Sequence, residues 1–249
     1  MKTILTLLLT TFITLNSFAQ KIKFELAPEY NKPKKYESVT KIDMEGPQTM
    51  IMDMTMHMDM TYSKLQDSLI NITAKFSNAK VDFDAGMMAG SFDSSKEPSN
   101  EMEKIFASQF KPLLENNLTY SMNKLGHIID IDFPNVSEQL FDKSTLSSFG
   151  TTYPNHSISI GDSWTKEGKM GQLGINSIST FKFAEKTTEG YKIESTVNLT
   201  DASGNNVGNS TGHFIVDPKT FITISSSNET NISLQGMTVK NVTQFKMIK

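Results

Sequence analysis

Methionine alternates with other residues along one short stretch of the chain. The methionines are Met50, Met52, Met54, Met56, Met58 and Met60. Thioethers are soft ligands that suit copper(I), and flexible thioethers two residues apart could converge on one ion. A spacing of two is also the period of an extended strand, which would place all six on one face. The stretch therefore predicts a long apolar strand face, with copper(I) binding as one possible chemistry.

The opposite face of the same strand would carry Asp53, His57 and Asp59. Imidazole and carboxylate groups at this spacing could hold a divalent metal or exchange protons. The same pattern is typical of a half-buried antiparallel sheet whose polar face meets water. We favour the solvated face and predict no metal site.

The sequence Gly161-Asp162-Ser163-Trp164 is similar to the nucleophile block of the Gly-Asp-Ser esterases. Those enzymes place the block in a parallel α/β domain and need a downstream Asp-x-x-His. Here the only later histidine is His213, and Ser210 stands three residues before it. A GxSxG elbow is also absent. We expect Trp164 to anchor the core at the start of a strand, and we predict that the chain is not an enzyme.

Asp201, Ser203 and Asn205 have the spacing of the first ligands of a calcium loop. An EF-hand needs glycine at position six and glutamate at position twelve, where this chain has Asn206 and Gly212. We predict a polar hairpin turn instead.

The composition excludes several classes of function. The chain has no cysteine, so it can form no disulfide, thiolate metal site or acyl-anchor cysteine. All 24 basic residues are lysine and the net charge is −3, so the bidentate contacts that arginine makes with phosphate and guanine are missing. We expect no cofactor and no nucleic-acid partner.

The first 19 residues have the features of a signal peptide. Lys2 gives a positive start, residues 4–15 are nearly all apolar or threonine, and Ser17-Phe18-Ala19 is a small-x-small cleavage site. The apolar run is too short to span a bilayer comfortably. We expect an exported protein, soluble in the periplasm or secreted, with no membrane span.

Residues 20–249 are expected to form one β-rich domain with a helical insert at about 98–150. The candidate strands are 36–45, 49–62, 68–76, 81–83, 118–122, 127–133, 157–160, 163–166, 177–184, 191–199, 212–216, 221–226 and 239–248. A helix is predicted over 100–116, with Glu103 at the capping-box position, and a weaker one from 135 towards 149. Residues 85–98 are predicted to be a mobile loop.

These elements favour a mainly β (α+β) fold. We predict a long curved antiparallel sheet or half-barrel with one or two helices packed on its concave face. At about 3.4 Å per residue, the methionine strand would extend about 40 Å, so it must coil or bulge.

The methionine face needs a cover. Burying one methionine is worth roughly 1.5–3 kcal/mol, so six wet side chains would forgo on the order of 10 kcal/mol. The apolar face of the predicted helix, with Met102, Ile105, Phe106 and Phe110, can supply part of the cover. Ordinary core packing and a groove for an apolar ligand both remain open.

Four motifs carry a resemblance. They are the methionine strand ahead of Tyr62, Phe92-Asp93-Ser94, Leu118-Thr119-Tyr120 with Gly126-His127-Ile128, and Ser159-Ile160-Gly161-Asp162-Ser163-Trp164. With them the chain resembles an uncharacterised family of exported bacterial proteins, a domain of unknown function. Many members look like lipoproteins, whereas this chain lacks the anchor cysteine. The layout is also similar to the half-barrel carriers that move lipoproteins and glycolipids across the periplasm.

We therefore expect a non-enzymatic exported binding protein for an apolar or amphiphilic ligand, such as a lipid or acyl chain. The pocket would be lined by Met50, Met52, Met54, Met56, Met58, Met60, Met102, Ile105, Phe106 and Phe110. The alternative is a structural or protein-interaction module of the cell envelope, with an envelope protein as partner. Copper(I) binding through the thioethers is the third hypothesis.

Overall fold

The computed structural model describes residues 21–134, 152–170 and 174–248, except Gln48, Asp67, Met87 and Gln235. The predicted signal peptide and the predicted second helix lie outside the described residues. Within the described part, no helix is long and apolar enough to cross a membrane.

Twelve strands and one helix make up the described residues. They are β1 (Lys34–Glu45), β2 (Met50–Gln66), β3 (Leu69–Asp84), β4 (Ala89–Asp93), α2 (Glu101–Glu115), β5 (Asn117–Asn123), β6 (Ile128–Asp132), β7 (Ser163–Met170), β8 (Ile175–Lys186), β9 (Tyr191–Thr200), β10 (Asn206–Val216), β11 (Thr223–Leu234) and β12 (Met237–Ile248).

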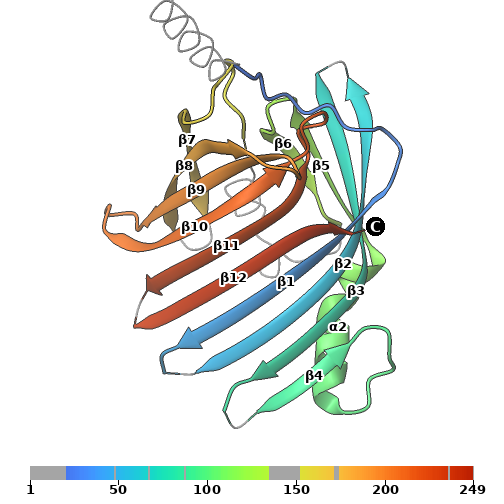
Figure 1. Cartoon of the computed structure of the whole chain (residues 1–249). Coiled ribbons are helices and arrows are strands. Elements are labelled where there is room, and N and C mark those ends of the chain that lie inside the picture. Colours follow the sequence, from blue (N-terminus) through green and yellow to red (C-terminus); the bar gives the residue numbers. More distant parts are fainter. Residues whose placement is uncertain are drawn as a thin grey trace, which may run out of the picture.

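The strands form a single open antiparallel sheet, so the predicted fold class is confirmed. Its order is β6-β5-β3-β2-β1-β12-β11-β10-β9-β8-β7, and β4 pairs with the last part of β3. Figure 1 shows one twisted, curved layer with β7–β9 towards one end and β4 with α2 towards the other.

The long β2–β3 hairpin contains the bulge that its length requires. His57 pairs with Asn78 but Met58 pairs with Phe76, so Ser77 is an extra residue in β3. This extra residue keeps apolar side chains facing the methionines on both sides of the bulge. It also breaks the alternation in the sequence, and for that reason the prediction of separate strands at 68–76 and 81–83 was wrong.

The helix begins where the capping pattern predicted. The side chain of Asn100 accepts a hydrogen bond from the Glu103 amide at 2.9 Å, and Glu103 Oε2 accepts one from the Ser99 amide at 2.6 Å. The loop predicted over 85–98 was wrong at β4. This strand buries only Phe92 and is otherwise small or polar, so it lacks an apolar pattern.

The C-terminal strands are longer than predicted. Strand β10 begins at Asn206 and β11 continues to Leu234, whereas the predicted strands covered 212–216 and 221–226. The added segments are mainly polar, so hydrophobic periodicity does not reveal them. The predicted strand at 157–160 is only an isolated bridge between Ile22 and Ile158.

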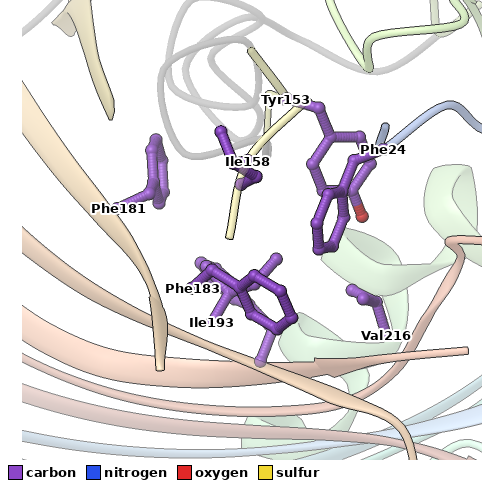
Figure 2. Close-up of a cluster of buried hydrophobic side chains, with 8 residues drawn as sticks. Phe24, Tyr153, Ile158, Phe181, Phe183, Ile193 and Val216 are labelled. Carbon is purple, nitrogen blue, oxygen red and sulfur yellow. The ribbon is translucent and has the colours of Figure 1, made fainter. Parts of the chain in front are cut away.

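An aromatic cluster fixes one end of the sheet. Phe24, from the N-terminal segment, packs edge-on against Phe183 of β8 with ring centroids 5.2 Å apart. Figure 2 shows Tyr153, Ile158 and Phe24 lying over Phe183, Ile193 and Val216 of the sheet. Trp164 packs against this cluster, and its Nε1 donates to the Thr152 carbonyl at 2.6 Å, which confirms it as a core anchor.

Candidate functional site

The methionine stripe and the aromatic cluster lie on the same face of the sheet. Directly paired residues in an antiparallel sheet point to the same side. The register leads from Met56 to Ser38, Phe245, Ser226 and Phe214, which belongs to the aromatic cluster. We call this side the inner face and the other side the outer face.

All six methionines of the stripe are half-buried. Met52, Met54 and Met56 pack against a buried cluster of Ala79, Val81 and Phe92. Phe106 and Phe110 of α2 pack against the same cluster. Phe110 stacks on Phe92 with centroids 5.7 Å apart, and Phe106 lies 5.0 Å from Phe83. The structure therefore brings five of the predicted lining residues together.

The second half of the stripe joins a separate cluster. Met56, Met58 and Met60 pack around Phe76, Leu118 and Phe133, together with Leu113 and Leu114 of α2. These last five residues were absent from the predicted lining. Their apolar spacing in the helix and hairpin was visible in the sequence, but the contact with β2 depends on the β3–β5 pairing.

The other three predicted lining residues lie apart from these clusters. Ile105 is 50% exposed on α2. Met102 lies beside β4, with its Cγ 3.7 Å from the position that a Cβ on Gly90 would occupy. Met50 pairs with Met44 at the end of the β1–β2 hairpin. None of the three belongs to either cluster.

Beside the middle of the stripe, the inner face carries uncharged polar side chains, interleaved with apolar ones such as Ile42 and Phe245. Its hydroxyl and amide side chains are Ser38 and Thr40 on β1, Asn241 and Thr243 on β12, Ser226, Asn228 and Thr230 on β11, and Ser210 on β10. We call this set the polar strip.

Hydrogen bonds connect members of the polar strip across strands. The hydroxyls of Thr40 and Thr243 are 3.4 Å apart, and Thr243 donates to Asn241 Oδ1 at 3.1 Å. Thr230 donates to Ser210 Oγ at 2.8 Å. Sequence reasoning missed this strip, although Ser226, Asn228 and Thr230 alternate in the same way as the methionines.

The two faces of these strands differ in charge. In the described part of β10–β12, and of β1 from Tyr36 to Met44, no charged side chain lies on the inner face. The outer face of β1, β11 and β12 carries Lys35, Glu37, Lys41, Asp43, Glu45, Glu229, Lys240 and Lys246. The inner face is thus unlike an ordinary solvent-exposed surface.

A lysine lies on the inner face further along, on β7. Lys166 pairs with the buried Ser179, and burial lowers its pKa to about 8. The nearby Ser177 hydroxyl is buried and has no hydrogen bond to any residue in the described segments.

Three tyrosines are buried, Tyr36, Tyr62 and Tyr153, and Tyr120 is half-buried. Burial raises the pKa of Tyr36, Tyr62, Tyr120 and Tyr153. Their hydroxyls stay protonated at neutral pH and can donate a hydrogen bond, although the Tyr36 hydroxyl has no partner among the described residues. Tyr153, for example, donates to the Phe221 carbonyl at 2.7 Å.

The ligand-type residues opposite the methionines do not converge. His57 Nε2 lies 3.1 Å from Glu37 Oε2, and Asp53 lies 3.6 Å from Lys41 Nζ. Within the described ranges, no group of three His, Cys, Asp or Glu residues could hold a metal ion. The Asp201 carboxylate accepts hydrogen bonds from the Ser203 and Asn205 amides, so the predicted polar hairpin turn is confirmed.

An open hollow of about 410 Å³ lies over β9–β12, mainly on the outer face. Lys192, Glu194, His213 and Glu229 are among its lining residues. Lys192 pairs with Glu194, and Glu229 pairs with Lys240, so three of these charges are already matched within the protein. The inner face is therefore the stronger candidate site.

No protein-family model matches the chain, and no curated protein sequence matches it. Weak structural similarity extends to several solved structures, among them the following two. One is a DUF1329 family protein from Desulfovibrio piger, with 6% identity, a TM-score of 0.29 and coverage of 87% of each chain. The other is a proposed outer membrane lipoprotein-sorting protein domain from Vibrio parahaemolyticus. It has 9% identity, a TM-score of 0.26 and coverage of 86% of this chain and 85% of that one. Both TM-scores are below 0.5, so these likenesses carry no argument about function.

Proposed function

We propose that this chain is a non-enzymatic exported protein that binds an apolar or amphiphilic molecule, such as a lipid or acyl chain, on its inner face. One observation carries the proposal. Six methionines lie on the sheet face against which aromatic side chains of α2 pack, yet each of the six stays half-buried. Such a face is apolar and still partly accessible.

The choice of methionine supports the proposal. Its side chain is unbranched and polarizable, and it adapts to varied apolar shapes better than leucine or isoleucine does. The helix packs chiefly over β3, β4 and β5, so it lies to one side of the β2 stripe. The methionines can therefore contact α2 on one side and a bound apolar chain on the other.

Native mass spectrometry of the protein purified from its own host tests the proposal directly. We expect a bound lipid, or stoichiometric uptake of dodecanoate by the delipidated protein. Met54→Lys should abolish this uptake, because it places a charge in the apolar stripe. The matched control Thr55→Lys places the same charge on the outer face of the same strand and should bind normally.

A clean apo mass with no uptake of fatty acids or detergents would contradict the proposal. The envelope-module hypothesis would then replace it. The copper(I)-binding hypothesis is tested separately by anaerobic titration of the protein against a copper(I) indicator. Thioether ligation would be favoured if the wild type competes with the indicator for copper(I) and the Met54→Leu/Met56→Leu variant does not. Leucine packs like methionine but offers no sulfur.

A further inference from the structure

We infer that the inner face prefers amphiphiles whose headgroup is uncharged and rich in hydroxyl groups. The headgroup would lie on the polar strip while the apolar chain lies on the methionine stripe. This inference rests on the proposed function and adds the class of ligand.

The composition of the polar strip indicates which headgroups it can bind. A face made only for internal packing would be apolar, and a face made for solvent would carry charges, as the outer face of the same strands does. The polar strip has neither property. Ser38, Thr40 and Ser210 are also at least nine-tenths buried, so their hydroxyls have little access to bulk water. Neutral hydrogen-bonding groups are the natural complement of such a surface.

The hydrogen bonds of the strip leave capacity for a ligand. Thr243 donates to Asn241, so the contact between the two threonines is a donation from Thr40 to Thr243. A hydroxyl has one donor and two acceptor positions, so the half-buried Thr243, which donates once and accepts once, keeps one acceptor position for a ligand. Asn228 adds an amide, whose Oδ1 lies 2.1 Å from where a Cβ on Gly212 would be. Glycine at position 212 is what leaves room for this amide.

The distances suit one molecule that covers both surfaces. Met54 pairs directly with Thr40, which pairs with Thr243, which pairs with Asn228. With strands about 4.8 Å apart, the polar strip begins about 5 Å from the stripe and extends to about 14 Å from it on β11. A chain on β2 and β3 would thus place its headgroup on β1, β12 and β11.

A charged headgroup would find no uncommitted counter-charge among the described side chains of these strands, because Lys34, on the inner face of β1, is already paired with Glu29 at 2.8 Å. Lys166 is on β7, four strand spacings or about 19 Å along the sheet from β11. Burying an ionised group without a partner is costly, whereas hydroxyls can exchange hydrogen bonds with the strip.

Isothermal titration calorimetry with three dodecyl amphiphiles, each below its micelle concentration, tests this inference. The probes are dodecyl maltoside, dodecylphosphocholine and dodecanoate, which share the alkyl chain and differ in headgroup. We expect the maltoside to bind at least about tenfold more tightly than the other two, which corresponds to one or two ordinary hydrogen bonds.

Paired threonines provide a matched set of variants. Thr40→Val/Thr243→Val removes two hydroxyls from the inner face, and Thr196→Val/Thr211→Val removes a directly paired set from the outer face. The inner variant should reduce the maltoside preference to within about threefold and leave dodecanoate affinity unchanged, while the outer variant keeps the full preference. If the inner double variant does not fold, Thr230→Val alone should reduce the preference.

The outcomes separate this inference from the proposed function. Equal affinity for all three probes, or tightest binding of dodecanoate, would overturn the neutral-headgroup preference while leaving apolar binding intact. Loss of the preference in both double variants would also overturn it. Failure of all three probes to bind would overturn the proposed function itself.

Discussion

The methionine stripe and the polar strip are neighbours on one sheet face and have opposite chemistry. Met54 and Thr40 are directly paired, yet one belongs to an apolar cluster with Phe106 and the other to a row of hydroxyls. The stripe has a helix beside it, whereas the strip is held mainly by strand pairing.

The difference suggests a division of roles. Apolar burial supplies most of the stability of a fold, so substitutions near the stripe should cost the most. Hydrogen bonds contribute little net stability but discriminate strongly between ligands, so substitutions in the strip should mainly alter selectivity. The predictions below test this division, from the largest expected effect to the smallest.

A charge in the middle of the stripe should have the largest effect. Met56 contacts both apolar clusters, so Met56→Asp should lower the free energy of unfolding by about 3 kcal/mol in urea titrations. The neighbouring outer-face variant Thr55→Asp should change it by less than about 0.5 kcal/mol. Equal losses in the two variants would mean that the stripe is no more buried than the outer face.

Truncation of an aromatic side chain of α2 should have the second largest effect on stability. Phe106→Ala removes ring contacts to Phe83 and Phe92 and should cost about 2–3 kcal/mol. Ile105→Ala, on the exposed side of the same helix, should cost under about 1 kcal/mol. The comparison is made by urea unfolding, and a reversed order would place the wrong side of α2 against the sheet.

Loss of the helix cap should separate the two regions in hydrogen exchange. Asn100→Ala should cost about 1 kcal/mol because the Glu103 amide loses its acceptor. Faster exchange should be confined to α2 and β4, while β10–β12 keep their protection. Uniformly faster exchange would show that α2 stabilises both regions equally.

Lys166 should make stability depend on pH in the alkaline range. Its pKa of about 8 is below the ordinary 10.5, so between these values the unfolded state holds more protons and stability rises with pH. Because the side chain is partly exposed, this contribution should be on the order of 1 kcal/mol. The wild type should therefore gain stability relative to Lys166→Met between pH 7.5 and 10. A constant difference would mean that Lys166 is solvated.

Exchange of a thioether for a branched alkyl group should have the smallest effect. Met54→Leu nearly conserves volume, so it should change the free energy of unfolding by less than about 1 kcal/mol. Binding of a dodecyl chain should be kept, and a large loss of binding would indicate that the sulfur itself contacts the ligand.

The same contrast explains what the sequence could predict. Alternating methionines identified β2, and the capping box with one apolar face identified the helix. The structure packs Phe106 and Phe110 of this helix against the same cluster as Met52, Met54 and Met56. The strip was missed because its side chains are small and polar, and over much of β10 and β11 such residues resemble a loop. Ile105 lies on the helix circumference near the apolar face, and only the packing of α2 shows that its side chain is half exposed.

The central claim is that an apolar chain lies on the methionine stripe. Photo-crosslinking with a dodecyl maltoside that carries a diazirine at the end of its alkyl chain, mapped residue by residue, tests it most directly. We predict adducts on Met52, Met54, Met56, Phe106 or Phe110, with none on the alternate residues Asp53, Thr55 and His57. Adducts on those outer-face residues or around the outer hollow, or no adduct at all, would contradict the account.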